Sequence, residues 1–250
     1  MNRVLSLVYV TLNLIQGLFG WMLKRVQHDV QASRAIYLIF CTFPSTFYPL
    51  PKLKEPNIMA KLTEIRWHGR GGQGAKTAAL LFGEAALSEG KYIQAFPEYG
   101  PERTGAPVQS FNRVSEEPIR IHCHVKSPDV VVVLDPTLIG PVDITSGLKD
   151  DGVVIINTAA SASEMREKLG LNGQKVFTID ASKIARETIG RDIPNTPMLG
   201  ALVKATGLLA YKTVMEDTRK KLEKKFRNRP EIIEGNLKAI DRAYSEIKSE

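Results

Sequence analysis

Residues 63–87 read TEIRWHGRGGQGAKTAALLFGEAAL, and this stretch decides the fold class. Thr63–Trp67 has the composition of a short β-strand, a glycine cluster follows, and Ala75–Leu87 is rich in the helix formers alanine and leucine. A strand, a tight glycine turn and a helix in direct succession are typical of α/β proteins with parallel sheets.

The rest of the chain from Met59 continues this alternation. Further strands are expected at Tyr92–Phe96 (closed by Pro97), Val108–Val114, Ile119–Val125 (as a hairpin with the preceding strand), Val130–Leu134, Val153–Ile156 and Val176–Ile179. Further helices are expected at Ser163–Leu169, Ala181–Ile189, Met198–Tyr211, Met215–Phe226 and Glu231–Ile247. The pattern predicts an α/β fold with a doubly wound, mostly parallel sheet, flanking helices and a helical C-terminus.

The composition excludes several classes of protein. Two cysteines among 250 residues are too few for an all-cysteine iron–sulfur cluster or a disulfide framework, and they favour a reducing, cytoplasmic setting. The net charge of +7 is unevenly distributed, because residues 1–58 hold six basic and two acidic residues. The remaining domain therefore carries only +3, which argues against a nucleic-acid partner.

The first 58 residues differ in character from the domain at 59–250. Val4–Leu23 is long and apolar enough to span a bilayer and is followed by Lys24 and Arg25. A proline-rich linker precedes Met59. Three interpretations remain open: upstream sequence from a start codon placed too early, a membrane anchor, or a small packed appendage.

The glycine turn is the strongest local candidate for a binding site. It fits G-x-G-x-x-G at Gly69, Gly71 and Gly74, with Arg70, Gly72 and Gln73 between them. Backbone amides at the start of the following helix would face an anion, and Arg70 would add a charge-assisted contact. The spacing does not match a Walker phosphate loop. A turn without any ligand is the alternative interpretation.

A dinucleotide site is less well supported by the sequence. The acidic residue that holds a ribose should end the second strand, about 20 residues after the turn. The nearest candidate is Glu98, which follows Pro97 at the start of a loop.

The loop Pro97–Pro107 is the second candidate site. Its proline and glycine content suits a stiff, positioned loop, and it carries Glu102, Arg103 and Thr104. Arg103 would grip a phosphate or carboxylate bidentately, unless the loop is merely a solvated turn.

Other polar residues give weaker signals. His122 and His124 are too few ligands for a metal site, and Cys123 between them is expected to be buried on the opposite strand face. Asp135 ends a buried strand, where ligands of doubly wound sheets bind, although Asp-Pro is also a common strand terminator. The basic run Arg219–Arg229 is expected to form a solvated helix face or to meet a partner subunit.

Four motifs in order carry a resemblance to a known family. They are Arg66–Gly74, Ala95–Pro107, Pro128–Leu138 and Asn195–Ala201. From Met59 to the C-terminus the chain resembles the gamma subunit of the pyruvate:ferredoxin oxidoreductase family of 2-oxoacid oxidoreductases. Residues 1–58 have no counterpart in that pattern.

The resemblance implies an enzyme complex in which this chain is not active alone. Such a complex converts pyruvate or another 2-oxoacid, coenzyme A and oxidised ferredoxin to acyl-CoA, CO2 and reduced ferredoxin. Alpha, beta and delta subunits are implied as partners, and they would hold the thiamine diphosphate, Mg2+ and [4Fe–4S] clusters. The gamma chain would bind no such cofactor, and it would contribute coenzyme A docking and subunit contacts.

On this sequence the implied docking residues are those of the glycine turn and of the second loop: Gly69, Arg70, Gly71, Gly72, Gln73, Gly74, Glu102, Arg103 and Thr104. No catalytic or metal-binding residue is assigned. A stand-alone NAD-dependent dehydrogenase and a non-catalytic nucleotide-binding module remain as alternatives.

Overall fold

The computed structural model describes residues 62–98, 105–227 and 229–250, which belong to a single unit, Ile58–Glu250. Its strands are β1 (Thr63–Arg70), β2 (Tyr92–Glu98), β3 (Pro107–Ser115), β4 (Val130–Val133), β5 (Val153–Asn157), β6 (Lys175–Ile179) and β7 (Lys248–Ser249). Its helices are α3 (Ala75–Ser88), α4 (Ala162–Leu169), α5 (Ala181–Ile189), α6 (Asn195–Thr206), α7 (Tyr211–Lys225) and α8 (Pro230–Glu246), with a 3₁₀ turn η1 at Pro136–Leu138.

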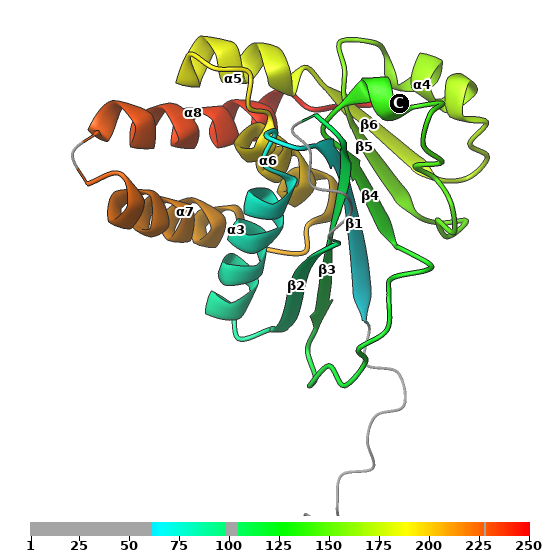
Figure 1. Cartoon of the computed structure of the whole chain (residues 1–250), viewed down its shortest axis with the longest axis horizontal. Coiled ribbons are helices and arrows are strands. Elements are labelled where there is room, and N and C mark those ends of the chain that lie inside the picture. The colour runs from blue at the N-terminus through cyan, green and yellow to red at the C-terminus, as the bar shows by residue number, and fades with distance from the viewer. Residues whose placement is uncertain (1–61, 99–104, 228) are drawn as a thin grey trace, which may run out of the picture. The chain divides into compact units, whose positions relative to one another are not determined.

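The strands form one sheet in the order β2-β3-β1-β4-β5-β6-β7 (Figure 1). β1, β4, β5 and β6 are parallel neighbours, whereas β3 and β7 pair antiparallel to their neighbours. All described strands except β3 and β7 therefore run in one direction. This confirms the mostly parallel sheet predicted from the sequence.

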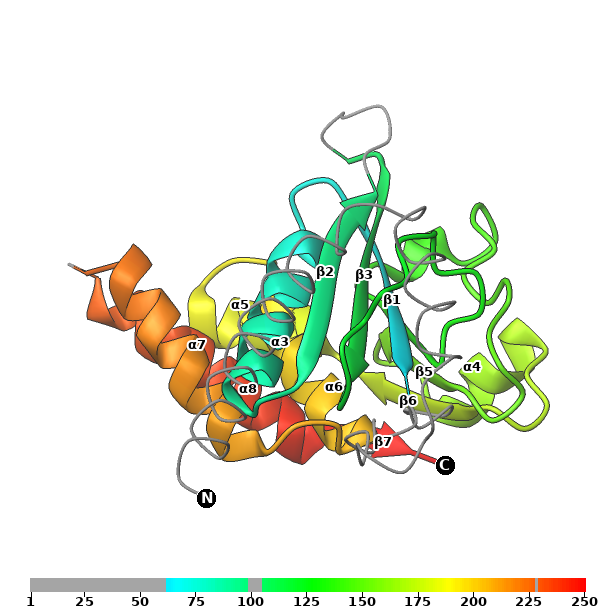
Figure 2. The same ribbon diagram turned by 90° about the horizontal axis from the view of Figure 1, so that it is seen from below.

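Helices cover both faces of the sheet, as a doubly wound fold requires. α3, α5, α6, α7 and α8 lie on one face, and α4 lies on the other (Figures 1 and 2). Alternate residues of β4 supply the two cores: Val130 and Val132 face the larger helical layer, and Val131 and Val133 pack with Met165 of α4. The strand is buried throughout, which explains its uninterrupted run of valines.

Side-chain hydrogen bonds tie β1 to its neighbours within the larger core. The indole nitrogen of Trp67 donates to Oδ1 of Asn112 on β3 at 2.8 Å. The amide of Asn112 in turn donates to the carbonyl oxygen of Ala79 in α3 at 2.9 Å. Both side chains are completely buried, so this chain of bonds fixes α3 against the sheet below the glycine turn.

Most predicted elements are confirmed with small changes at their ends. β1 continues to Arg70, so the first two residues of the glycine cluster belong to the strand. α6 begins at Asn195 and ends at Thr206, because Gly207 takes a left-handed conformation (φ 62°). Pro97 lies inside β2 rather than closing it, which an edge strand tolerates.

The predicted strand at Ile119–Val125 is wrong. β3 already pairs with β1 on one edge and with β2 on the other, so no edge remains for a hairpin partner. Instead, the buried guanidinium of Arg113 donates to the carbonyl oxygen of Cys123 at 2.6 Å and pairs with Glu64 at 2.7 Å. Cys123 is exposed, contrary to the expectation of a buried thiol.

The predictions for residues 1–58, including the apolar segment Val4–Leu23, concern residues outside the described ones. Within the part of the chain that is described, no helix combines the length and the apolar character needed to cross a membrane.

Candidate functional site

The glycine turn joins the end of β1 to the start of α3. The carbonyl oxygen of Arg70 accepts from the amide of Gln73 at 3.1 Å, and the amide of Arg70 donates to Oε1 of Gln73 at 2.8 Å. Gly72 and Gly74 have φ values of 101° and 85°, which side-chain-bearing residues rarely adopt. A Cβ on Gly74 would also lie 2.7 Å from Nδ2 of Asn195, so both the backbone conformation and the lack of space require glycine at this position.

The start of α3 is open to an anionic group. Gly74 is the N-cap, no side chain among the described residues caps the helix, and its first turn contains no acidic residue. The first amides of any α-helix lack intrahelical partners, and the helix dipole adds positive potential there. These amides therefore have the character of an anion-binding site.

The turn lies where the sheet changes its winding direction. The chain leaves β1 through α3 toward β2 and β3, whereas β4 lies on the other side of β1. The segments that follow β1 and β4 meet at the carboxyl edge of these two parallel strands. Doubly wound proteins bind ligands in the crevice at such a point.

Arg70 bridges the two segments. Its Nε donates to Oδ2 of Asp135 at 3.1 Å, its NH2 group donates to Oγ1 of Thr137 at 2.9 Å, and its NH1 group donates to the carbonyl oxygen of Gly105 at 3.0 Å. The arginine side chain remains 32% exposed. A guanidinium carries five N–H donors, so donors remain for a ligand after these contacts.

Asp135 is the centre of this network. Besides Arg70, its carboxylate accepts from Nε2 of Gln73 at 2.8 Å and from the amide and hydroxyl of Thr137 at 2.9 and 2.7 Å. Burial alone would raise the pKa of Asp135, but the hydrogen bonds from Thr137 and Gln73 and the charge of Arg70 lower it below the ordinary value. The carboxylate thus stays charged and partly neutralises Arg70.

The second candidate loop is anchored on the glycine turn at its C-terminal end. The amide of Gly71 donates to the carbonyl oxygen of Ala106 at 2.9 Å, and the amide of Gly105 donates back to Gly71 at 3.2 Å. Glu102, Arg103 and Thr104 lie outside the described residues.

Glu98 is exposed at the end of β2, and β3 separates that strand from β1. In a dinucleotide fold, the strand carrying the ribose-binding acid lies directly beside β1. The geometry therefore disfavours Glu98 in that role.

The motif Asn195–Ala201 has a packing role. A Cβ on Gly200 would lie 2.3 Å from the carbonyl oxygen of Ile240, so α6 and α8 approach more closely than any larger residue allows. The hydroxyl of Thr196 also donates to Oδ1 of Asn236 on α8 at 2.9 Å, in a buried position.

His68 is a buried histidine on the sheet face opposite α3. Burial, followed by the nearby charge of Arg66, lowers its pKa from 6.5 to about 3, so the ring is neutral at pH 7. Its Nε2 has no hydrogen-bond partner among the residues that the structure describes. Within the described ranges, no three His, Cys, Asp or Glu side chains gather in a way that would hold a metal ion.

Sequence reasoning identified the turn and Asp135 but missed the contacts made by Thr137, Gly105 and Gln73. The signal that would have found Thr137 is its position two residues after a strand-ending aspartate, a common Asx-turn arrangement. Gly105 gives no comparable signal, since it contributes only a carbonyl oxygen.

An α/β domain with a glycine turn at the switch point of its sheet has the architecture of the doubly wound proteins that bind ligands at this point. Comparison with known proteins makes this specific. Residues 64–246 match the model of the pyruvate ferredoxin/flavodoxin oxidoreductase family. The chain belongs to this family.

The relatives of this chain within the family are gamma-type subunits, and this chain is a gamma-type subunit as well. It is 50% identical over 191 residues to the pyruvate synthase subunit PorC of Thermotoga maritima, covering 76% of this chain and 97% of that protein. It is 55% identical over 160 residues to the pyruvate/ketoisovalerate oxidoreductases common subunit gamma of Pyrococcus abyssi, and the match covers 63% of this chain and 86% of that protein.

Solved structures agree with this assignment. The crystal structure of the pyruvate oxidoreductase subunit PORC from Thermotoga maritima superposes with a TM-score of 0.66 at 48% identity, covering 75% of this chain and 98% of that one. The crystal structure of the keto/oxoacid ferredoxin oxidoreductase gamma subunit from Geobacter sulfurreducens superposes with a TM-score of 0.57 at 25% identity, covering 73% of this chain and 96% of that one.

Proposed function

We propose that this chain is the gamma subunit of a cytoplasmic pyruvate:ferredoxin oxidoreductase that also contains alpha, beta and delta subunits. The complex would convert pyruvate, coenzyme A and oxidised ferredoxin to acetyl-CoA, CO2 and reduced ferredoxin. The supporting finding is the match to PorC of Thermotoga maritima along nearly the whole length of that subunit.

Within this complex, the chain would dock coenzyme A at the glycine turn. The observation that carries the proposal is the open N-terminus of α3, reached through left-handed Gly72 and Gly74 at the switch point. Coenzyme A carries a pyrophosphate and a ribose phosphate, which suit backbone amides at a helix start. Arg70 would contribute its remaining N–H donors while Asp135 holds its orientation.

The redox cofactors would belong to the other subunits. Thiamine diphosphate and Mg2+ would perform the chemistry on the 2-oxoacid, and [4Fe–4S] clusters would carry the electrons. A four-cysteine cluster cannot be built from the two cysteines of this chain.

The alternative function, a stand-alone NAD-binding dehydrogenase, would require a different strand order. The acidic residue after the second strand should lie beside the glycine turn, yet β3 lies between β2 and β1. A non-catalytic nucleotide-binding module remains compatible with the site geometry, since a gamma subunit is itself an accessory to the chemistry.

Purification of the tagged full chain from its native cells tests the function. We expect a thiamine-dependent iron–sulfur complex that reduces ferredoxin with pyruvate and coenzyme A. A homo-oligomer that binds NAD and ignores coenzyme A would refute the proposal.

Site variants in the assembled complex then test the docking role. Arg70→Gln and Arg103→Ala should each raise the apparent KM for coenzyme A while the complex still forms, and the KM for pyruvate should stay constant. An unchanged KM for coenzyme A would remove that arginine from the docking site.

A further inference from the structure

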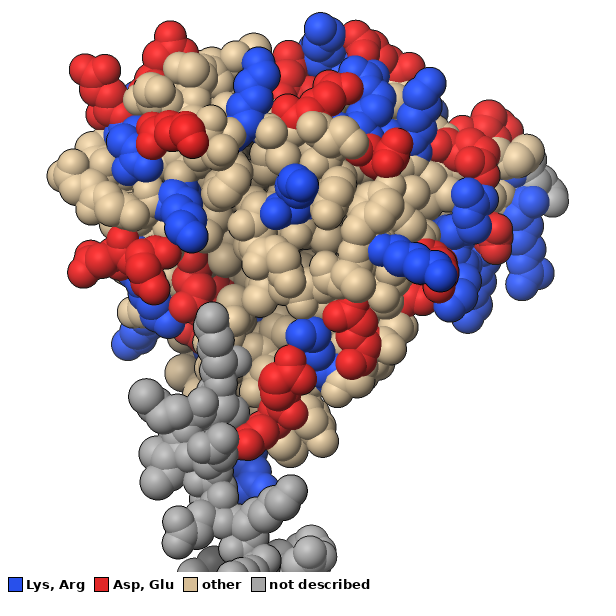
Figure 3. Space-filling view, turned by 180° about the vertical axis from the view of Figure 1, so that it is seen from behind, with Lys and Arg blue, Asp and Glu red and all other residues tan. Residues whose placement is uncertain are grey.

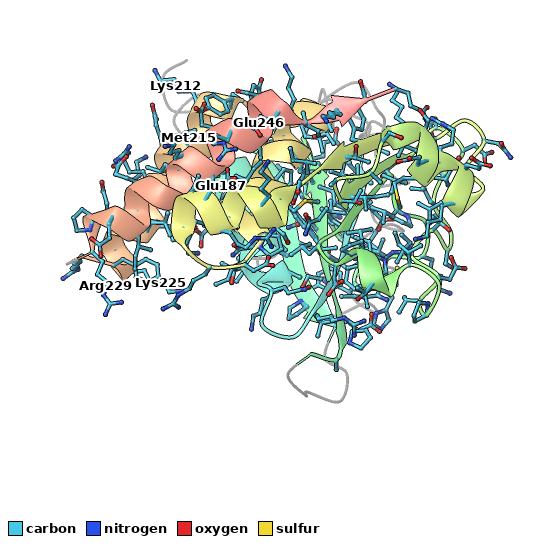
Figure 4. All side chains as sticks on the ribbon, turned by 90° about the horizontal axis from the view of Figure 1, so that it is seen from above. Glu187, Lys212, Met215, Lys225, Arg229 and Glu246 are labelled. Carbon is cyan, nitrogen blue, oxygen red and sulfur yellow. The ribbon has the colours of Figure 1, made fainter. Side chains whose placement is uncertain are left out.

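A cluster of cations gathers where α7 ends and α8 begins. Lys224, Lys225, Arg227 and Arg229 are exposed, and with the half-buried Phe226 they line an open hollow of about 560 Å³. The space-filling view shows blue side chains crowded at this end of the molecule (Figure 3). The labelled Lys225 and Arg229 lie near each other there and point away from the sheet (Figure 4). We call this region the helical tip.

The four cations of the helical tip form no ion pair within the described chain. One or two turns earlier on α7, Arg219 pairs with Glu234 at 2.6 Å, Lys220 pairs with Asp217 at 3.1 Å, and Lys221 pairs with Glu84. The four cations of the tip have no acidic partner within 4 Å among the residues that the structure describes. The same helix therefore carries a neutralised half and a charged end.

Helix dipoles explain only part of this distribution. Lys224 and Lys225 occupy the last turn of α7, where a cation is favourable. Arg229, however, is the N-cap of α8, and no described side chain caps that helix with a hydrogen bond. A cation at a helix N-terminus opposes the dipole, and Glu231 is the single acid of the first turn. Arg227 and Arg229 thus add positive charge at the N-terminus of α8, where the helix dipole is already positive.

A partly exposed aromatic ring, which packs on the small core of Leu222, Ile233 and Leu237, lies among these cations. Phe226 is half-buried, and Nζ of Lys225 lies 5.3 Å from its ring centroid. Aromatic and arginine side chains are enriched in protein interfaces. A partner that covers this surface would complete the burial of the ring and supply the missing negative charge.

We propose that the helical tip docks on a carboxylate-rich surface of another subunit of the same oxidoreductase. This inference rests on the proposed function. The cations are exposed around an open hollow, which suits a broad protein surface better than a small phosphate held by converging buried donors. A nucleic acid would need an extended basic face, and the domain as a whole carries only +3 outside residues 1–58.

Zero-length cross-linking of the assembled complex tests the contact directly. A carbodiimide activates a carboxylate, and a neighbouring lysine amine then attacks it to form an amide with release of the urea. Because no spacer is inserted, the reaction joins only side chains that lie in close contact. We expect cross-links from Lys224 or Lys225 to acidic residues of another subunit, and protection of both lysines from acetylation in the complex. Equal acetylation in the free chain and in the complex, without cross-links, would overturn the inference.

A charge-reversed pair measures the contribution of the tip to assembly. Lys225→Glu/Arg229→Glu should weaken assembly by about 10-fold or more at low salt and flatten its salt dependence. Lys168→Glu/Lys183→Glu makes the same change of charge at exposed positions on α4 and α5, and it should alter assembly less than about 2-fold. Circular dichroism and thermal unfolding confirm that both variants fold.

The outcomes separate this inference from the proposed function. If the wild-type chain does not assemble with other subunits, the proposed function fails. If wild type and tip variant assemble equally well, only the tip inference fails. Tip-dependent binding of inorganic pyrophosphate or of single-stranded DNA, without an effect on assembly, would overturn it in favour of those ligands.

Discussion

Replacing Asp135 by alanine tests whether the carboxylate organises the glycine turn. The side chain accepts four hydrogen bonds, from Arg70, Gln73 and twice from Thr137, and it is 11% exposed. Losing the charge-assisted bonds to Arg70 and Gln73 costs about 1.5–3 kcal/mol where the donors are buried. Losing the bond to the Thr137 amide at the start of η1 adds about 1 kcal/mol.

The expected cost is smaller than the sum of these contributions. Arg70 is about a third exposed, so water replaces part of what Asp135 provides, and its share is discounted accordingly. We expect Asp135→Ala to lower the free energy of unfolding by about 2–3 kcal/mol, and Arg70→Met to lower it by about 1 kcal/mol. Urea unfolding of the full chain, followed by circular dichroism, measures both.

A double-mutant cycle isolates the contact between the two residues. The coupling free energy of Arg70 and Asp135 should be about 0.5–1 kcal/mol, since one partner is partly exposed. A coupling near zero, or a cost below about 0.5 kcal/mol for Asp135→Ala, would refute the central role of this carboxylate. Thr137→Val should weaken the same network, because the hydroxyl both donates to Asp135 and accepts from Arg70.

The pH dependence follows from the lowered pKa of Asp135. The folded state holds the carboxylate charged more firmly than the unfolded state does. Its stabilising contribution is therefore complete above the ordinary aspartate pKa of 3.8 and is lost as the pH falls through the lower, folded-state value. The difference in unfolding free energy between wild type and Asp135→Ala should stay constant from neutral pH down to about the ordinary aspartate pKa of 3.8 and shrink only at lower pH.

Further predictions concern buried positions outside the network. Folding depresses the pKa of His68 to about 3, so the neutral ring favours the folded state fully above pH 6.5. As the pH falls from 6.5 toward 3, the unfolded state gains a proton first, and the free energy of unfolding drops by up to about 5 kcal/mol. His68→Gln should flatten the curve of unfolding free energy against pH in that window. Gly200→Ala should cost about 2–3 kcal/mol by forcing α6 away from α8, whereas Gly83→Ala, whose Cβ would contact neighbours at 3.4 Å, should change thermal stability by less than about 1 kcal/mol. Arg113→Met should destabilise by about 3 kcal/mol and expose the segment around Cys123 to limited proteolysis, and an unchanged digestion pattern would contradict the role of Arg113 as its anchor.

The failed strand at Ile119–Val125 shows where local pattern reasoning ends. The segment alternates acceptably for a strand, but strand formation also requires a free edge on a neighbour. β3 has none, because β1 and β2 occupy both of its edges. The buried guanidinium of Arg113 satisfies the carbonyl oxygens of Ile121 and Cys123 instead. The strand order, which local sequence patterns do not reveal, thus excluded the expected hairpin with β3.

The same distinction separates the predictable and unpredictable parts of the candidate site. The glycine turn was predictable because left-handed conformations at Gly72 and Gly74 are requirements of the local backbone. The partner of Arg70 was not, since Asp135 is 65 residues away and meets it only because β1 and β4 are parallel neighbours. Once that pairing is known, the two sequence motifs that contain these residues become halves of a single network. A ligand at the turn would then contact a surface whose charge is set jointly by both halves, so that changing either one alters the other's capacity to bind.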